Sequence, residues 1–407
     1  MTRLLFVVFL PFAVSYFLSF LFRSVNAVIA SELSLVAGLS AGALGMLTAA
    51  FFLGFAVMQL PMGLLLDRYG ARRVQGVLLI VGAAGSALFA VAQSEFAFIV
   101  ARALIGAGMA GGLMAGLKAL VTWFPQERIP LINGMLLAAG GLGAIASTWP
   151  VIYVLEISTW RVIFWALAAA AMGAAVLILT VVPEKPKVET AAGWRPYIEG
   201  LSMVLRDRTF WRVAPISITG MGASLAIQTL WAGPWLSQVN GLDRREVTLR
   251  LFALTAGMTA GFLLTGVVAQ ALLRRGISLL TTMIAGSLIF IAVQGLILLE
   301  VDAGGILLWI VFGLIANVTA LVYPLLAAHF SADYVGRAGS ANTFIVFLGT
   351  FVIQYLMGLI IEAFDANGQG ARPALGYKWS FGAVLLLQAL AVGALLAPHG
   401  RRSLKTE

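Results

Sequence analysis

Apolar residues fall into twelve long runs along the chain, with polar stretches between them. Each run is long enough to cross a bilayer as a helix, which takes about 20 mainly apolar residues. The runs are continuous, whereas strands of a membrane β-barrel alternate apolar and polar positions. The pattern therefore predicts an all-α membrane protein with twelve transmembrane helices. The predicted spans are 9–31, 42–66, 74–93, 97–122, 131–155, 161–182, 210–238, 247–273, 277–299, 304–328, 340–363 and 378–397.

The composition excludes a soluble protein. Of the 407 residues, 61% are apolar and 11% are charged, and the mean hydropathy is +0.99. A soluble chain carries about 25% charged residues, so this chain needs membrane lipid around it. The formal net charge of +9 comes from Lys and Arg in short loops rather than from one basic face, so we expect no nucleic-acid partner.

Residue types that several chemistries require are scarce. The sequence has no Cys, which excludes disulfides, thiolate metal sites and cysteine nucleophiles. Its two histidines, His329 and His399, are too few for a histidine-rich metal centre. No nucleophile–base pair or set of metal ligands stands out. We therefore expect neither an enzyme nor a bound cofactor or metal.

The distribution of Lys and Arg predicts the orientation in the membrane. With a cytoplasmic N-terminus, 17 of the 26 Lys and Arg residues fall in cytoplasmic segments and 6 fall outside. Basic residues are enriched in cytoplasmic loops, so both termini are predicted to be cytoplasmic. Eukaryotic sorting signals and long loops are absent, and we expect a bacterial inner-membrane protein.

The chain reads as a repeat of two halves. The only long polar interruption is 183–209, and six spans lie on each side of it. The halves echo each other at an offset of about 205 residues: PheProGlnGluArg at 124–128 has a counterpart at 330–337. Such repeats are typical of transporters that rock one half against the other. The predicted domains are an N-terminal bundle at 1–182, a cytoplasmic linker at 183–209 and a C-terminal bundle at 210–407.

Two motifs carry a family resemblance. The turn after the second span reads GlyLeuLeuLeuAspArgTyrGlyAlaArgArg at 63–73, and the fourth span contains ArgAlaLeuIleGlyAlaGly at 102–108. They resemble the G-x-x-x-D-R-x-G-x-R-R and R-x-x-x-G-x-G patterns of the major facilitator superfamily. The resemblance covers the whole chain and implies two pseudo-symmetric six-helix bundles and alternating access. It also implies a conformational latch made by Gly63, Asp67, Arg68, Gly70, Arg72 and Arg73.

A physical argument supports the latch. The span 340–363 starts on the same membrane face as Asp67, so the positive end of its helix dipole is expected near that carboxylate. A carboxylate there favours closure of the face by about 0.3–1 kcal/mol. The alternative is that Asp67 and the arginines only anchor the turn among lipid headgroups.

Three charges fall well inside the predicted spans, and all are positive: Arg23, Arg102 and Lys118. Each costs about 2.5–3.5 kcal/mol at the bilayer centre, so each calls for a partner or a wet cavity. Every Asp and Glu falls in a loop or near the end of a span. The sequence thus predicts a cationic cavity without a fixed counter-charge, which a substrate anion could fill.

Polar residues form a stripe on one span of each half. Tyr16, Ser19, Arg23 and Asn26 share one face of the first span. At the repeat offset, Ser224, Gln228 and Trp231 lie on the seventh. We interpret the stripes as walls of a binding site; the alternative is interhelical hydrogen bonding. The predicted substrate-binding residues are Arg23, Tyr16, Asn26, Gln228, Trp231 and Arg102.

The remaining candidates have simpler interpretations. Arg102 either acts in the site or pairs with backbone carbonyls or Glu32. Lys118 lies four residues from the end of its span and is expected to snorkel to the surface. His329 lies where its span meets the cytoplasm, and we expect a solvated or capping role.

The segment PheArgSerValAsn at 22–26 resembles the first-helix arginine region of the anion-handling branches of the family. Phosphate antiporters pair that arginine with one in the seventh helix, where this chain has Gln228. This difference favours a monovalent group such as a carboxylate. Organic-acid symporters carry a glutamate where this chain has Met109, which puts proton coupling through that position in doubt.

We therefore expect a secondary transporter that moves a small organic anion, by symport or exchange, with H⁺ or Na⁺ as a coupling ion. One alternative is an exporter of amphiphilic metabolites or drugs, whose activity would survive loss of Arg23. Another is a non-transporting membrane receptor that kept the fold. Such a sensor should carry an appended domain or a long tail, whereas this chain stops about ten residues after its last span.

Overall fold

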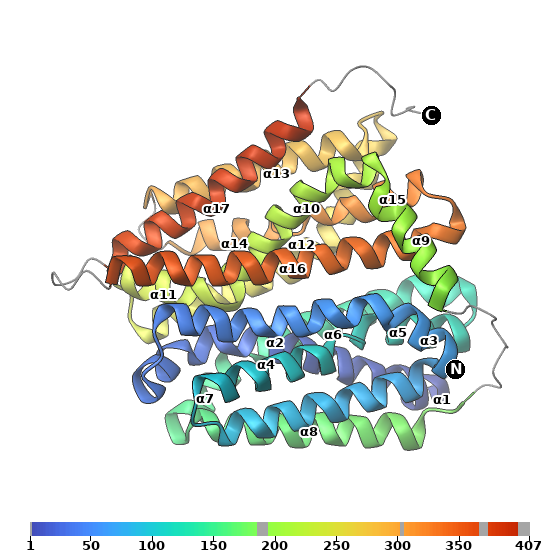
Figure 1. Cartoon of the computed structure of the whole chain (residues 1–407), viewed down its shortest axis with the longest axis horizontal. Helices are drawn as coiled ribbons and strands as arrows, with labels where there is room; N and C mark the ends of the chain where they lie inside the picture. Colours follow the sequence, from blue (N-terminus) through green and yellow to red (C-terminus); the bar gives the residue numbers. More distant parts are fainter. Residues whose placement is uncertain (1, 185–193, 302–304, 366–372, 398–407) are drawn as a thin grey trace.

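A computed structural model describes residues 2–184, 194–301, 305–365 and 373–397, and the regular elements in these ranges are helices (Figure 1). His399 and the basic residues at 185, 187, 372, 401, 402 and 405 lie outside the described ranges. The all-α class predicted from the sequence is confirmed.

The elements of the first half begin with a single short helical turn and a π-helical turn. They are α1 (Thr2–Leu4), η1 (Leu5–Phe9), α2 (Leu10–Ala37), α3 (Ala41–Val91), α4 (Glu95–Met109), α5 (Gly112–Trp123), η2 (Gln126–Arg128), α6 (Ile129–Ala146), α7 (Trp149–Ile157) and α8 (Trp160–Val181).

The second half follows one additional helix, α9 (Trp194–Arg206). Its elements are α10 (Arg208–Ala226), η3 (Ile227–Trp231), α11 (Ala232–Gln238), α12 (Arg244–Arg274), α13 (Leu279–Leu298), α14 (Ile306–Ile315), η4 (Val318–Leu321), α15 (Val322–His329), α16 (Ala332–Asp365) and α17 (Pro373–Leu396).

The described residues contain 11 helical stretches long and apolar enough to cross a membrane, and one of them, α3, is 51 residues long. A straight helix of that length would measure about 76 Å, more than twice the bilayer core. Gly70, with φ 79° and ψ 159°, interrupts α3 in a conformation that favours glycine. Because α4 packs against both parts of α3, the chain folds back at Gly70 and α3 supplies two of the twelve predicted spans.

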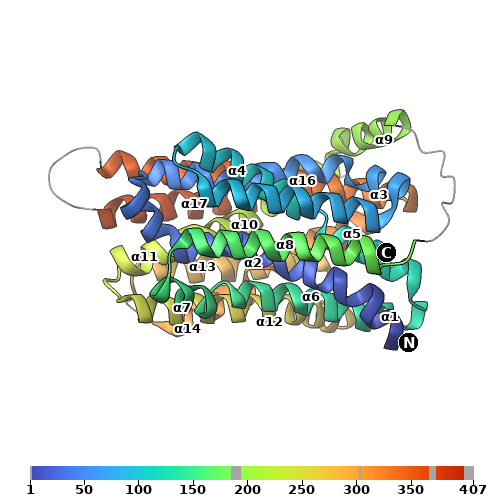
Figure 2. The ribbon, with the colours of Figure 1, turned by 90° about the horizontal axis from the view of Figure 1, so that it is seen from below.

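The helices form two layers (Figure 1). Helices α2–α8 make one bundle and α10–α17 make the other, which agrees with the predicted pair of six-helix bundles. Helices α1 and α9 lie at one end of the molecule, here called the α9 end, and α7 and α11 lie at the other, the α11 end (Figures 1 and 2). The basic loop residues predict that the α9 end faces the cytoplasm.

Glycines bring equivalent helices close together in each half. A β-carbon on Gly106 of α4 would overlap the backbone carbonyl of Phe51 in α3. In the second half, a β-carbon on Gly313 of α14 would overlap the carbonyl of Leu254 in α12. Lipid gives no hydrophobic drive for helices to associate, so such close backbone packing is a main source of stability. The repeat predicted from the sequence thus appears as a repeated packing contact.

The two halves meet chiefly through α3 and α16. A β-carbon on Gly358 of α16 would lie 2.7 Å from the carbonyl oxygen of Ala41 and 3.2 Å from Cα of Gly45. On a second line of contact, a β-carbon on Gly233 after η3 would lie 2.9 Å from the carbonyl oxygen of Ala27 in α2. These contacts bring the backbones of the two halves together toward the α11 end.

The predicted linker 183–209 contains an unexpected helix, α9. Its Tyr197 hydroxyl donates to the carbonyl oxygen of Leu60 in α3 (2.5 Å), and Arg337 of α16 lies against Gly200. Burial raises the pKa of Tyr197 further above neutral pH, at which a tyrosine hydroxyl is protonated and able to donate in any case. The segment is polar overall. Its helix is stabilised by these contacts with both halves, which the sequence does not show.

The glycine packing gives a stability prediction. Gly106→Ala should destabilise the protein by about 1–3 kcal/mol, because the added carbon overfills the α3–α4 contact. Gly134→Ala is the matched control, since no atom lies within 4 Å of the β-carbon it would add. Thermal unfolding in detergent measures both. Equal melting temperatures for the two variants would contradict the packing argument.

Candidate functional site

Arg23 on α2 lies in an aromatic cage formed by both halves. Its guanidinium carbon is 4.7 Å from the ring centre of Phe20, 5.1 Å from that of Phe55 and 5.3 Å from that of Phe347. Phe20 and Phe55 belong to the first half, and Phe347 comes from α16 of the second. Phe55 and Phe347 also contact each other, with ring centres 4.3 Å apart.

The cage does not neutralise Arg23. The side chain is 8% exposed, and its Nε is buried without a hydrogen-bond partner. No ion pair between Arg23 and a carboxylate occurs within the described ranges. Contact with aromatic faces contributes about 0.5–2 kcal/mol, which offsets part of the cost of burying the charge. An anion would offset the rest.

Arg102 on α4 contacts the backbone of α2. It is fully buried, and its Nη1 donates to the carbonyl oxygen of Phe22, the residue before Arg23 (3.1 Å). Its guanidinium also lies 5.0 Å from the ring centre of Phe51, while Nε and Nη2 have no partner. The geometry therefore shows the carbonyl pairing that the sequence left open, and it places a second positive charge near Arg23.

The polar stripe of the first span, here called the α2 stripe, consists of Tyr16, Ser19, Arg23 and Asn26. Apart from Arg23, the contacts of these residues described here lie within the first half. Asn26 Nδ2 donates to Thr48 Oγ1 of α3 (3.1 Å), and Asn26 Oδ1 has no partner. The ring of Tyr16 packs edge-on against Phe20 at 5.1 Å. Asn26 therefore makes the kind of interhelical hydrogen bond considered as an alternative, while one acceptor stays unused.

In the second half, Gln228 and Trp231 lie on η3, a π-helical turn within the seventh span. Trp231 Nε1 donates to the carbonyl oxygen of Gln354 on α16 (3.3 Å), and its ring lies against Gly45 of α3. Gln228 is 6% exposed. Single π-helical turns inside α-helices occur frequently at functional sites. Sequence periodicity gives no sign of this turn.

Two spans are interrupted at equivalent places in the two halves. One break separates α4 from α5 at Ala110–Gly111, and the other separates α14 from η4 at Ala316–Asn317. The two breaks are about 206 residues apart, which matches the repeat offset. Interrupted helices in corresponding positions are typical of transporter binding sites.

The break in the first half lies against the α2 stripe. Ser19 Oγ donates to the freed carbonyl of Met109 (3.1 Å), and Gln59 Nε2 donates to that of Ala110 (3.2 Å). A β-carbon on Gly112, at the start of α5, would lie 3.3 Å from the Tyr16 ring. The carbonyl end of α4 and the N-terminal end of α5 therefore both face this stripe, and their opposite partial charges meet there. Gly111 and Gly112 at this break are also typical of close helix packing, so the sequence does not indicate the interruption.

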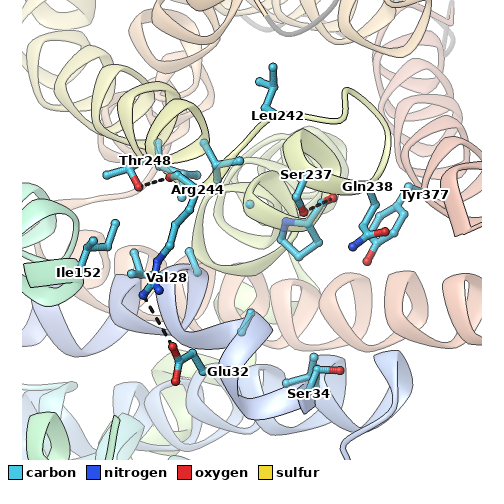
Figure 3. A pocket seen from close by; sticks show the side chains of 17 residues that line it. Val28, Glu32, Ser34, Ile152, Ser237, Gln238, Leu242, Arg244, Thr248 and Tyr377 are labelled. Atoms are coloured by element: carbon cyan, nitrogen blue, oxygen red, sulfur yellow. Dashed lines mark hydrogen bonds and ion pairs between the residues drawn. The ribbon is translucent and has the colours of Figure 1, made fainter. Parts of the chain in front are cut away.

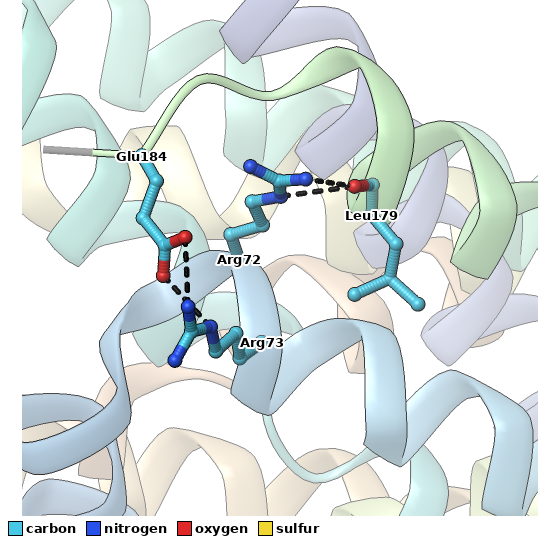
Figure 4. A network of polar contacts seen from close by, with 4 residues as sticks. All are labelled: Arg72, Arg73, Leu179 and Glu184. Carbon is cyan, nitrogen blue, oxygen red and sulfur yellow. Dashed lines mark hydrogen bonds and ion pairs between the residues drawn. The ribbon is translucent and has the colours of Figure 1, made fainter.

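The predicted latch residues belong to α3, and Arg72 and Arg73 are shown with their partners in Figure 4. Both Nε and Nη2 of Arg72 donate to the carbonyl oxygen of Leu179 in α8, and Arg73 pairs with Glu184 (2.8 Å). The guanidinium of Arg68 lies 5.4 Å from the ring centre of Tyr69, and Gly63 faces the ring of Tyr197. The turn is therefore tied to α8 and to the linker.

Asp67 has a partner that the sequence did not indicate. Lys118 Nζ of α5 lies 2.5 Å from Asp67 Oδ1, with both side chains 46% exposed. Lys118 thus reaches the α9 end, as expected of a snorkelling residue. The described contact of Asp67 lies within its own half, and its interaction with the dipole of α16 stays a prediction.

His329 also lies at the α9 end, where its Nε2 is 3.2 Å from Oδ2 of Asp207. Burial acts to raise the pKa of Asp207, but its hydrogen bonds with the Phe210 N–H and with His329 outweigh this effect and lower it. Asp207 also caps the first turn of α10. The pair fixes the end of α15 to the start of α10.

Comparison with known proteins identifies relatives over most of the chain. The family model described as Major Facilitator Superfamily matches residues 12–354. The "Probable sulfoacetate transporter SauU" of Cupriavidus necator is 24% identical over 378 residues, 85% of each chain. The "Hexuronate transporter" of Bacillus subtilis is 26% identical over 378 residues, 83% of this chain and 88% of the relative.

A solved structure shows the same fold. The crystal structure of a bacterial homolog of the human lysosomal transporter Spinster, inward-facing and occupied, aligns with a TM-score of 0.77 at 17% identity. The alignment covers 95% of both chains. The fold and the matches define a multi-pass helical membrane transporter rather than an enzyme. The chain belongs to the Major Facilitator Superfamily and is a secondary transporter, which confirms the resemblance seen in its motifs.

The Asp67–Lys118 pair gives a testable prediction. Asp67→Asn and Lys118→Gln should each shift the ratio of the two transporter conformations in the same direction, and the double variant should add little more. Each should change stability by less than about 1 kcal/mol, because the pair is half exposed. Cysteine accessibility in this cysteine-free chain measures the ratio. Additive shifts would show that the two residues act separately.

Proposed function

We propose that the protein moves a small organic anion, with a carboxylate favoured, across the membrane by alternating access, and that Arg23 holds the anion. One observation carries the proposal: a guanidinium lies between aromatic rings of both halves without a carboxylate partner in the described ranges. A substrate anion at this position would touch both halves at once. Its binding therefore could influence how they move against each other.

The charge distribution supports an anion. Arg102, which donates to the Phe22 carbonyl, adds a second positive charge beside α2. A buried charge without a partner is costly, so binding of an anion gains the interaction that the protein itself lacks. A cationic substrate would meet repulsion from both guanidiniums. The names of the two relatives, which refer to sulfoacetate and hexuronate, agree with an anionic substrate.

The other predicted substrate-binding residues are proposed to hold the rest of the substrate or to support Arg23. Tyr16 and Trp231 provide aromatic surface for the apolar part of the substrate, and Asn26 and Gln228 provide hydrogen-bonding groups. Arg102 positions the backbone of α2 through Phe22 and adds to the potential. The proposed coupling ion is H⁺ or Na⁺, and the α9 end with both termini is proposed to face the bacterial cytoplasm.

The alternative of an exporter for amphiphilic compounds draws on the same aromatic residues. Phe51, Phe52, Phe55 and Phe347 form a connected group of rings beside Arg23. An apolar substrate could stack on them without using the charge. The two functions differ in whether transport depends on Arg23.

A test of the anion site replaces Arg23 with Gln. Uptake of glucuronate or sulfoacetate into proteoliposomes should fall about 10- to 150-fold in kcat/KM, the loss expected for a charge-assisted hydrogen bond worth 1.5–3 kcal/mol. Arg212→Gln, at an exposed arginine at the start of α10, is the matched control and should transport as the wild type does. Unchanged transport by Arg23→Gln would overturn the proposed site and favour the exporter.

A test of alternating access targets the contact between α3 and α16. Gly358→Ala adds a carbon 2.7 Å from the carbonyl oxygen of Ala41 and should widen the α11 end. Spin labels at Glu156→Cys of α7 and Gln238→Cys of α11 report the separation by double electron–electron resonance. Gly393→Ala is the control, because nothing lies within 4 Å of its added carbon. Identical distance distributions in both variants would argue against closure through this contact.

A further inference from the structure

A cavity of about 430 Å³ lies near the α11 end (Figure 3), and its lining residues include neither Arg23 nor the rings around it. Its walls come from both halves: α2, α3 and α7 on one side, and α11, α12 and α17 on the other. The volume is within the range of small-molecule sites, which is about 300–1,000 Å³. Most of the wall is apolar, and the polar groups include Glu32, Arg244, Ser237, Gln238 and Thr248.

The charged pair in this cavity joins the two halves. Glu32 at the end of α2 and Arg244 at the start of α12 approach with Oε1 and Nη2 3.7 Å apart (Figure 3). This ion pair connects the first half with the second. Opening of the α11 end would separate these two side chains.

The geometry of the pair leaves Arg244 available to another carboxylate. A charge-assisted N–H···O bond is about 2.7–2.9 Å long, so the 3.7 Å approach is an ion pair without a close hydrogen bond. The Arg244 side chain is 53% exposed and that of Glu32 is 29% exposed. Exposed pairs of this kind contribute little net stability, so a competing anion faces a small barrier.

We propose that this cavity is a second anion-binding site, at which a small carboxylate displaces Glu32 from Arg244. The inference rests on the proposed transport of an organic anion and extends it to the route by which the anion enters or leaves. The incoming carboxylate takes the place of the Glu32 carboxylate, so Arg244 keeps a counter-charge throughout. The hydroxyl of Ser237 and the amide of Gln238 provide hydrogen-bonding groups on the same wall.

Displacement has a structural consequence. When the anion replaces Glu32, α2 loses its ionic contact with α12, while the glycine contacts between the halves remain. A ligand shifts a conformational equilibrium only through different interactions with the two states. Here the difference is the Glu32–Arg244 contact, which the anion breaks. Binding at this site would therefore favour separation of the halves at the α11 end.

The experiment uses the full-length chain with Ser237→Cys as its single thiol. The rate of modification is measured with an anionic reagent, 2-sulfonatoethyl methanethiosulfonate, and a cationic one, 2-(trimethylammonio)ethyl methanethiosulfonate. Glucuronate and sulfoacetate, added separately, should slow modification several-fold in a saturable manner. Arg244→Gln should abolish this protection and the preference for the anionic reagent. The uncharged methyl methanethiosulfonate should react equally with both proteins, which checks that the variant is folded.

Glu32→Gln should raise the rate with the anionic reagent several-fold and give protection at lower anion concentrations, because the competing carboxylate is gone. Glu156→Gln removes an exposed carboxylate on α7 at the same end and is the matched control; it should leave both rates unchanged. Protection that survives in Arg244→Gln, or a Glu32→Gln variant that behaves as the parent does, would overturn the proposal.

Arg23→Gln separates this proposal from the proposed function. It should lose uptake but keep protection of the thiol at position 237, because the two sites are distinct. If Arg23→Gln transports normally and protection still requires Arg244, the central site is wrong and the outer site stands. If anions are transported through Arg23 and never protect the thiol, the outer site is wrong and the proposed function stands.

Discussion

The positive charge of Arg23 inside the membrane constrains the surrounding structure. Aromatic faces from α2, α3 and α16 surround its guanidinium without neutralising it, and Arg102 holds the adjoining backbone while adding more positive charge. Burying a charge in this way is costly, which is the physical basis for the anion site proposed above. Because the rings around Arg23 come from both halves, an anion that neutralises this charge would lie at their interface.

Close packing provides the rigid frame around this charge. Glycines join α3 to α4 and α12 to α14 within the halves, and they join α3 to α16 between them. Backbone contacts of this kind are either made or broken, since a packed interface has little room for intermediate positions. The contacts within each half have no reason to change during transport. The contact between the halves lies toward the α11 end, where the loose Glu32–Arg244 pair also lies.

Several features of the candidate site were within reach of the sequence, and others were not. The burial of Arg23 and the absence of nearby acidic residues followed from its place in an apolar run. The partners of that charge did not, because Phe55 and Phe347 lie on other helices and nothing in the sequence places their rings beside Arg23. Lys118 was recognised as able to reach the surface, yet its pairing with Asp67 required two helices to lie side by side. At the break after α4, Ser19 and Gln59 donate to the freed carbonyls of Met109 and Ala110 from other helices. At the break after α14, the side chain of Asn317 donates to the carbonyl oxygen of Met258 in α12.

The sequence alone determined the helical class, the number and approximate limits of the spans, the repeat and the family motifs. Those properties depend on local hydrophobicity and on short motifs, because a bilayer requires about 20 consecutive apolar residues whatever the tertiary fold. Only the tertiary structure decided that α9 is helical, which side chains surround Arg23, and that a cavity bridges the halves beside Glu32 and Arg244. Each of these depends on contacts between residues distant in the chain, and helix-to-helix packing, rather than residue type, determines which of them meet.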